Sequence, residues 1–318
     1  MTKIYPLSPL TRKANTRLAD NFQSSDIITL YKEQLNINVS SFFPGIASIQ
    51  LFECIDTGYK FYHPKGLDGD SRFYESLQHK LNAGYYHDWK FENELAYNAI
   101  QEGDKVLDIG CGIGNFLMKA KNKTSEVYGL ELNKMAVNVC HTKGLKVFDE
   151  LIEQHAENHI EEYDMVCMFQ VLEHVSDVQS FILSALKVLK VGGKLLIGVP
   201  NNEPYFAGYD KFCTLNLPPH HMGLWNKRVF DKFAPLFGLT INSVKYDKKP
   251  RIIASSYLRA KYHAGIKSLP GKHTSREKIK MVFYAIYSFP ITLFEKLTGK
   301  LHGAHIAVLF TKTKNVVL

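Results

Sequence analysis

From Lys105 onwards, short apolar runs alternate with segments of helical spacing, and this alternation restricts the fold more than any other feature. The strand-like runs are KVLDIG, EVYGLEL, LKVF, DMVCMFQ and KLLIGVPN, and stretches such as NFLMKAKNK separate them. Buried strands joined by helices form parallel βαβ units. We therefore predict an α/β fold: a doubly wound, Rossmann-like, seven-stranded and mostly parallel sheet. Its last two strands would be LTINSVKYD and AHIAVLFTKT, which could pair.

The rest of the chain divides around this core. The first 100 residues look irregular and rich in aromatic side chains, except for a helical stretch, ENELAYNAIQ. In SDVQSFILSALKVLKVGG we expect a helix capped by Ser176 and ended by its glycines. An acidic stretch, EQHAENHIEEY, comes before the strand candidate DMVCMFQ and is assigned to no element. We expect an N-terminal unit over 1–84, the catalytic core over 85–250, a basic and apolar helical insertion over 251–300, and a final core strand within 301–318.

Composition limits the class of protein. Five scattered cysteines among 318 residues indicate reduced thiols and a cytoplasmic location rather than a disulfide framework. We identify neither a secretion signal nor an apolar run long enough to cross a membrane. The net charge is +8, and the part from Ile241 to Leu318 holds 15 Lys and Arg against 3 Asp and Glu. Such a region can attract phosphorylated substrates, nucleic acid or an anionic membrane, or it can simply be a solvated basic face.

The glycine-rich segment Asp108-Ile-Gly-Cys-Gly-Ile-Gly114 ends the first strand and opens the next helix. Glycines allow a tight turn and the close approach of a ligand, and Glu131, about 20 residues on, can accept hydrogen bonds from ribose hydroxyls. In a dinucleotide-binding loop of the G-x-G-x-x-G type, the third glycine would stand at Asn115. A carboxylate at Asp108 would also repel a pyrophosphate, whereas it suits a cofactor that carries an ammonium and a sulfonium. These residues favour S-adenosylmethionine over NAD.

Together, VLDIGCGIGNFL, YGLELN, YDMVCMFQVLEHVSD and LKVGGKLLIGVPN resemble class I S-adenosylmethionine-dependent methyltransferases. The likeness is greatest to the branch of ubiquinone-biosynthesis O-methyltransferases and of sugar and natural-product methyltransferases. It covers roughly Tyr85 to Phe237 and does not specify the acceptor.

The resemblance implies a cofactor site at matching positions. Five residues of the glycine-rich segment would frame the methionine part of the cofactor. Glu131 would hold the ribose, and Leu132 would pack beside the adenine. Asp149 would contact the adenine, although VFDELIEQ departs from the usual pattern, and Phe169 and Gln170 would lie over the cofactor. Tyr86, with Tyr85 and Trp89, resembles a lead-in helix that covers the cofactor, and a role in the core is equally compatible. The framing group is Asp108, Gly110, Cys111, Gly112 and Gly114.

Two histidine-bearing loops are candidates for catalysis. Some relatives hold a divalent metal with Glu-x-x-Glu-His, but here Gln170 replaces the first glutamate before Glu173 and His174. We therefore expect no metal there, and these two residues either take part in catalysis or brace the helix entry. The second loop, PPHHMGLWN, presents His221 and His220, our first and second choices for a general base, unless they are structural.

Two further segments bear on cofactors and partners. FECIDTGYKFYHP resembles half of a zinc ribbon, but Thr57 stands where a second cysteine would pair with Cys54, so we expect no zinc and an aromatic core. MVFYAIYSFPITLFEKLTGK could rest on a membrane surface, grip a lipid-linked acceptor or pack on its own domain.

The function that fits best is methyl transfer to a hydroxyl, or to N or C, of a small molecule or glycan, with phosphate-bearing or lipid-linked acceptors included. No nucleic-acid-reading module is recognisable. The alternative functions are a non-catalytic protein that keeps the methyltransferase fold as an S-adenosylmethionine-binding, cofactor-sensing or scaffolding module, and an NAD-dependent oxidoreductase.

Overall fold

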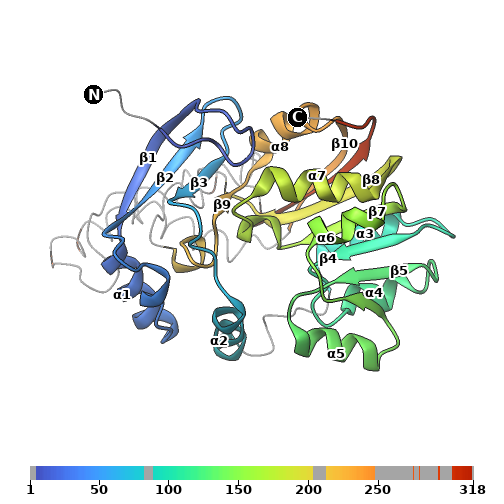
Figure 1. Cartoon of the computed structure of the whole chain (residues 1–318), viewed down its shortest axis with the longest axis horizontal. Helices are drawn as coiled ribbons and strands as arrows, with labels where there is room; N and C mark the ends of the chain where they lie inside the picture. The colour runs from blue at the N-terminus through green and yellow to red at the C-terminus, as the bar shows by residue number, and fades with distance from the viewer. Residues whose placement is uncertain are drawn as a thin grey trace.

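The computed structural model describes residues 5–81, 89–202, 213–247 and 303–316, and the isolated positions Ser275, Ile279 and Leu293. Two sheets organise these residues, a four-stranded sheet built largely from the N-terminal part and a seven-stranded sheet (Figure 1). The seven-stranded sheet has the order β10-β11-β8-β7-β4-β5-β6. Its strands are β4 (Val106–Ile109), β5 (Val127–Leu130), β6 (Lys146–Phe148), β7 (Tyr163–Phe169), β8 (Leu189–Pro200), β10 (Leu239–Tyr246) and β11 (His305–Lys312).

The pairing confirms the predicted doubly wound sheet. Strands β4 to β8 run parallel to their neighbours, while β11 pairs antiparallel with both β8 and β10. The expected pairing of the last two strand candidates is therefore confirmed. From β4 the chain builds β5 and β6 on one side, and it then returns to build β7 and β8 on the other. Open α/β sheets bind ligands beyond the carboxyl ends of the strands at such a reversal.

Helices cover both faces of this sheet. On one face, α3 (Phe91–Ala99), α4 (Asn115–Ala120) and α5 (Lys134–Thr142) bury apolar side chains against the strands. The other face packs against α6 (Ile152–Asn158), α7 (Val178–Val188) and α8 (Lys227–Leu236). Because β4 to β8 run parallel to one another, the loops that follow these strands lie at one edge of the sheet, its carboxyl edge.

The N-terminal part is regular, which corrects the expectation of irregular structure over the first 100 residues. Its elements are β1 (Thr16–Gln23), α1 (Ser24–Leu35), η1 (Ser40–Phe42), β2 (Ser48–Cys54), β3 (Lys60–His63) and α2 (Ser71–Leu81). Only the two residues Thr16 and Phe22 of β1 are buried, so the strand lacks the apolar alternation that would reveal it. Buried aromatic side chains make much of this core, among them Phe22, Tyr31, Phe43, Tyr62 and Phe73.

A short strand from the second histidine loop completes the N-terminal sheet. Strand β9 (Gly223–Leu224) pairs with β3, so that Phe61 faces Gly223. The main-chain N–H of Tyr62 also donates to the carbonyl of Met222 at 3.1 Å. The four-stranded sheet therefore holds the loop that carries His220 and His221.

Two local expectations were wrong. The helix α7 is capped by Asp177, whose carboxylate accepts from the Ser180 N–H, while the Ser176 hydroxyl donates to Asp68. Gly192 and Gly193 lie within β8 rather than at the end of the helix. The acidic stretch assigned to no element includes most of α6, a seven-residue helix too short to display a clear period.

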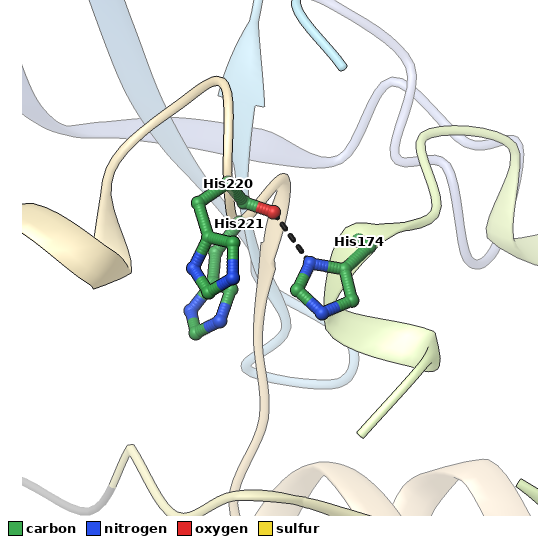
Figure 2. Close-up of side chains that lie close together, drawn as sticks. All are labelled: His174, His220 and His221. Carbon is green, nitrogen blue, oxygen red and sulfur yellow. Dashed lines mark hydrogen bonds between the residues drawn. The ribbon is translucent and has the colours of Figure 1, made fainter. Parts of the chain in front are cut away.

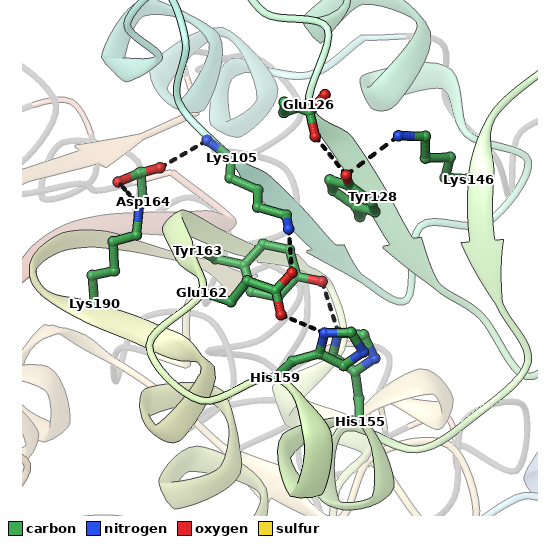
Figure 3. Close-up of polar contacts among 10 residues, drawn as sticks. All are labelled: Lys105, Glu126, Tyr128, Lys146, His155, His159, Glu162, Tyr163, Asp164 and Lys190. Carbon is green, nitrogen blue, oxygen red and sulfur yellow. Dashed lines mark hydrogen bonds and ion pairs between the residues drawn. The ribbon is translucent and has the colours of Figure 1, made fainter.

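A network of charged and aromatic residues occupies the opposite, amino edge of the sheet (Figure 3). Lys105, just before β4, pairs with Glu162, which also contacts His159. The buried imidazole of His155 bridges Glu150 at 2.6 Å and the Tyr163 hydroxyl at 2.8 Å. None of the side chains in this network is among the described buried groups that lack a hydrogen-bond partner.

No helix within the described residues is long and apolar enough to cross a membrane. The expected insertion over 251–300, with its basic and apolar stretches, lies outside the described residues apart from Ser275, Ile279 and Leu293.

Candidate functional site

Most of the residues predicted to bind the cofactor lie at the carboxyl ends of β4, β5, β6 and β7. The glycine segment follows β4, Glu131 and Leu132 follow β5, Asp149 follows β6, and Gln170 follows β7. The sheet thus brings together residues spread over about 60 positions of sequence, at the edge where such folds bind ligands. Tyr86 lies outside the described residues, so its predicted place over the cofactor stays a prediction.

The glycine segment forms a tight loop under steric constraint. Gly110 has φ +73°, and a Cβ built there would lie 2.6 Å from Val171 Cγ2. Gly114 has φ +76°, and its Cβ would lie 2.3 Å from Leu145 Cδ1. Neither position can hold a side chain without displacing a neighbour, which explains the glycines independently of any ligand.

Asp108 lies beneath this loop, near the end of β4. Asp108 is 2% exposed, and its Oδ1 has no hydrogen-bond partner among the described residues. Burial, with smaller contributions from Glu131 and Cys140, raises the pKa of this carboxyl well above its usual value. A buried carboxyl oxygen without a partner costs free energy, so a ligand that donates a hydrogen bond or carries positive charge would be stabilised here.

Glu131 connects β5 to the glycine loop. Its Oε2 accepts from the Gly112 N–H at 2.9 Å, and its Oε1 accepts from the Asn133 N–H at 2.8 Å. A carboxylate can accept about four hydrogen bonds, so both oxygens keep acceptor capacity for a ligand. The side chain therefore orients the loop and can still receive ribose hydroxyls.

The remaining predicted cofactor residues differ in exposure. Leu132 is 55% exposed and Asp149 is exposed, whereas Phe169 is half-buried against Phe116 with ring centroids 4.9 Å apart. Cys111 is buried, and its thiol lies under the loop beside the carbonyl of Gly112. Leu132 offers an apolar surface next to Glu131.

Gln170 adopts a strained conformation and reveals a residue that the sequence analysis missed. It has φ +57°, which is uncommon for a residue other than glycine and often marks functional sites. Its amide donates to Glu92 Oε1 at 3.3 Å. Glu92, from α3, is 1% exposed, and its Oε2 has no partner in the described part of the chain. Its helix was predicted, but no motif distinguishes this glutamate from those around it.

Glu173 and His174 follow in η3 (Leu172–His174). Glu173 is 1% exposed, and burial raises the pKa of its carboxyl to about 8. Its Oε2 lacks a partner among the described residues, and its Oε1 lies 3.8 Å from His174 Nε2.

The structure brings His174 together with His220 and His221 (Figure 2). The rings of His220 and His221 stack with centroids 4.4 Å apart, and the His174 ring lies 4.7 and 5.1 Å from them. One ring nitrogen of each lies within 4.8 Å of one from each of the others, the only such group of three potential metal ligands within the described ranges. The two candidate loops thus form one cluster.

Each of these rings is held through its Nδ1. His174 Nδ1 donates to the carbonyl of His220 at 2.6 Å, and His220 Nδ1 donates to the carbonyl of Leu215 at 2.9 Å. His221 Nδ1 lies 2.9 Å from Asn216 Oδ1, which accepts from it. With Nδ1 as the donor, Nε2 of each neutral ring carries a lone pair.

Burial keeps the three imidazoles neutral. It lowers the pKa of His174 to about 4 and that of His220 to about 3, with His174 adding to the effect on His220. The pKa of His221 also falls well below its usual value, mainly through burial and then through the other two histidines. The cluster therefore offers uncharged nitrogen lone pairs, and it resists holding a proton.

The N-terminal part holds the loop that carries His220 and His221 in place. The Tyr31 hydroxyl donates to the carbonyl of Leu217, and the Tyr62 hydroxyl donates to that of Asn216, both at 2.9 Å. Thr214, in η4 (Thr214–Asn216), donates to Gln34 of α1 at 2.7 Å. These contacts could not be predicted from sequence, because they join residues more than 150 positions apart.

Comparison with known proteins agrees with this architecture. Residues 82–243 match the model of the Methyltransferase domain family. The chain is 36% identical over 123 residues to the ubiquinone biosynthesis O-methyltransferase of Aliivibrio fischeri (strain MJ11), an alignment that covers 35% of this chain and 53% of that protein. It is 33% identical over 123 residues to the protein of the same name from Proteus mirabilis, covering 35% and 50%. The chain thus spans about half the length of the curated relatives it matches.

The fold is also present among solved structures. A SAM-dependent methyltransferase from Archaeoglobus fulgidus superimposes with a TM-score of 0.50 at 17% identity, covering 76% of this chain and all of that one. The family match spans just over half of the chain, including the glycine loop, Glu131 and the histidine cluster. This chain therefore belongs to the Methyltransferase domain family.

Proposed function

We propose that this chain is an S-adenosylmethionine-dependent methyltransferase that acts on a hydroxyl of a small molecule or glycan. The observation that carries the proposal is that two acidic side chains, Asp108 and Glu131, lie beside the glycine loop. These two carboxyls lie at the point where the strand order reverses, and Asp108 Oδ1 has no partner in the described part of the chain.

The charge of this site selects among nucleotide cofactors. A pyrophosphate placed at the loop would lie beside two acidic side chains, and its charge would be repelled. A cofactor with an ammonium and a sulfonium would be attracted, and its ribose hydroxyls could donate to Glu131. Exposed Leu132 supplies an apolar surface of the kind that packs against a base.

S-adenosylmethionine, when bound, supplies a methyl carbon made electrophilic by the adjacent sulfonium. As the acceptor oxygen forms its bond to that carbon, the carbon–sulfur bond breaks and the hydroxyl loses its proton. The products are the methyl ether, S-adenosylhomocysteine and a proton. The protein mainly has to align the acceptor, exclude water and receive the proton.

The three-histidine cluster is the part of the chain suited to the acceptor. Val171 packs on Gly110 and lies three residues before His174, so the segment that carries one member of the cluster also contacts the cofactor loop. We place the acceptor hydroxyl against the ring nitrogens, with His221 first and His220 second as direct proton acceptors. Burial lowers the pKa values of these imidazoles, so they would accept the proton only as the carbon–oxygen bond forms and the hydroxyl becomes acidic, and they would then release it readily.

The acceptor class is an oxygen nucleophile, in keeping with the names of the relatives from Aliivibrio and Proteus. Nitrogen and carbon nucleophiles would use the same alignment. The basic region after Ile241 would suit a phosphate-bearing acceptor or a lipid-linked one at an anionic surface, and most of its charges lie outside the described residues.

Thermal unfolding with different ligands tests the cofactor. At about 100 times its Kd, S-adenosylhomocysteine should stabilise the chain by about 2.7 kcal/mol and raise its Tm by roughly 5 °C. Glu131→Gln should weaken binding by roughly 10- to 100-fold, because it loses charge-assisted hydrogen bonds.

Glu157→Gln, an exposed change in α6, is the matched control and should bind as the original chain does. A larger stabilisation by NADH than by S-adenosylhomocysteine would contradict the proposal and favour an oxidoreductase. Stabilisation by neither ligand would favour a scaffold.

A further inference from the structure

We propose that His174, His220 and His221 form a binding site for a divalent transition-metal ion, with Zn²⁺ as the best match. The proposal deepens the proposed function, since a metal ion here would bind the acceptor oxygen in place of a direct imidazole contact. It also departs from the expectation, based on Gln170, that the chain binds no divalent metal. That expectation considered η3 alone, and the fold adds two histidines from a loop 46 residues further on.

The ring orientations fit metal ligation. Metal-bound histidines almost always donate their other ring N–H to a carbonyl or carboxylate, which fixes the tautomer and the ring plane. Here all three Nδ1 atoms have such acceptors: the carbonyl oxygens of His220 and Leu215, and Asn216 Oδ1. The supporting hydrogen bonds of a three-histidine site are therefore present, and Nε2 is the nitrogen left for the metal. The His174 ring also hydrogen-bonds to the backbone of Gln170, a contact that metal binding would replace.

The spacing is close to that of a bound site. Zn–N bonds of about 2.0–2.1 Å place the nitrogens of a tetrahedral site roughly 3.4 Å apart. One ring nitrogen of each histidine lies within 4.8 Å of one from each of the other two. Side-chain rotations that bring them together by ~1.5 Å or less would complete the site.

Glu173 provides an independent reason for a cation at this place. Its carboxyl is almost fully buried, its Oε2 has no partner among the described residues, and its Oε1 lies 3.8 Å from His174 Nε2. The nearby Glu92 leaves a second buried oxygen, Oε2, without a partner in the described chain. A buried carboxyl beside imidazole lone pairs is costly, and a positive ion between them removes that cost.

The donor set indicates which metal binds. Neutral imidazoles suit zinc, copper, iron and nickel, whereas magnesium and calcium prefer oxygen ligands. Three protein nitrogens with one open position are the pattern of catalytic zinc sites, and an oxygen bound at the open position has a lowered pKa. A hydroxyl acceptor is the substrate class that would benefit.

Metal content and metal binding by the full chain, without an affinity tag, test this proposal. The chain purified without chelators should contain about one Zn²⁺ by mass spectrometry. The metal-free chain should bind Zn²⁺ in competition with a chromogenic chelator, and Co²⁺ should give visible bands of a tetrahedral site. These readouts need neither cofactor nor acceptor.

His220→Asn and His221→Asn are the sharpest variants. The asparagine amide nitrogen can replace Nδ1 in its hydrogen bond, while the variant lacks Nε2, so the loop keeps its anchors and loses a ligand. Each should weaken Zn²⁺ binding by ~10–100-fold or more. His159→Asn, in the amino-edge network, is the matched control and should leave Zn²⁺ binding unchanged.

The outcomes separate this proposal from the proposed function. Zn²⁺ affinity that is equal in the original chain and in the double variant His220→Asn, His221→Asn would overturn the metal site, as would the lack of stoichiometric binding. S-adenosylhomocysteine binding should survive in both asparagine variants, because the cofactor residues are unchanged. Its loss in the original chain would overturn the methyltransferase proposal and leave the metal site standing.

Discussion

At Gly110 two separate constraints act on one residue. Its φ of +73° lies in the left-handed region, and Val171 Cγ2 occupies the space that a Cβ would need. Gly103 has a similar φ of +82°, but a Cβ there would meet nothing within 4 Å. The two glycines therefore allow backbone strain and steric contact to be measured separately.

Gly103→Ala should lower the free energy of unfolding by about 1–2 kcal/mol, the cost of a left-handed alanine. Gly110→Ala should cost roughly 1–3 kcal/mol more, because the new methyl group also displaces Val171. Urea unfolding of both variants gives the comparison. Equal losses would show that Val171 gives way freely, and the double variant Gly110→Ala, Val171→Ala should recover part of the difference.

Individual residues were predictable from sequence where their chemistry depends on near neighbours. The glycines, Asp108 and Glu131 occupy one strand–loop–helix–strand unit, so their order along the chain fixes their relation in space. Glu92 and Gln170 lie 78 positions apart, and nothing in either segment signals the contact. The histidine cluster was missed for the same reason, although each of its members was singled out.

At the scale of elements, the sequence predicted the buried strands best. Strands β4, β7 and β8 each contain consecutive buried apolar residues rather than an alternating pattern, because both faces of the sheet are covered by helices. The largely exposed β1 and the seven-residue α6 gave no usable period. The pairing of β9 with β3 was not predictable, since two residues cannot display a strand pattern.

The tether between the N-terminal sheet and the histidine loop can be tested at Tyr62. Tyr62→Phe removes the hydroxyl that donates to the Asn216 carbonyl, and Asn216 in turn anchors His221. The free energy of unfolding should fall by about 1–3 kcal/mol, and Zn²⁺ binding should weaken while S-adenosylhomocysteine binding stays the same. Calorimetry and the chelator competition measure these effects.

Tyr128→Phe is the matched control, since its hydroxyl bonds to Glu126 at 2.5 Å, away from the loop (Figure 3). It should leave Zn²⁺ affinity unchanged. A Tyr62→Phe variant with unaltered Zn²⁺ affinity would mean that the hydrogen bond stabilises the fold without positioning the cluster.

Across the whole molecule, the two edges of the large sheet differ in how their buried polar groups are satisfied. The amino edge pairs Lys105 with Glu162 and His155 with Tyr163. At the carboxyl edge, Asp108, Glu173 and Asn201 each leave a buried oxygen without a partner in the described structure. Unpaired buried oxygens cost stability, so their concentration at the edge predicted to bind ligands supports a site made for cationic or hydrogen-bond-donating groups.

The central claim is that this edge binds S-adenosylmethionine, and a calorimetric titration with S-adenosylhomocysteine tests it most directly. The sample should be folded and freed of copurified small molecules. We expect one binding event per chain with a Kd in the micromolar range or below, equivalent to about −8 kcal/mol or more favourable. A folded chain that gives no heat and no stabilisation with this ligand would contradict the account, because the methyltransferase fold would then lack a site for the cofactor.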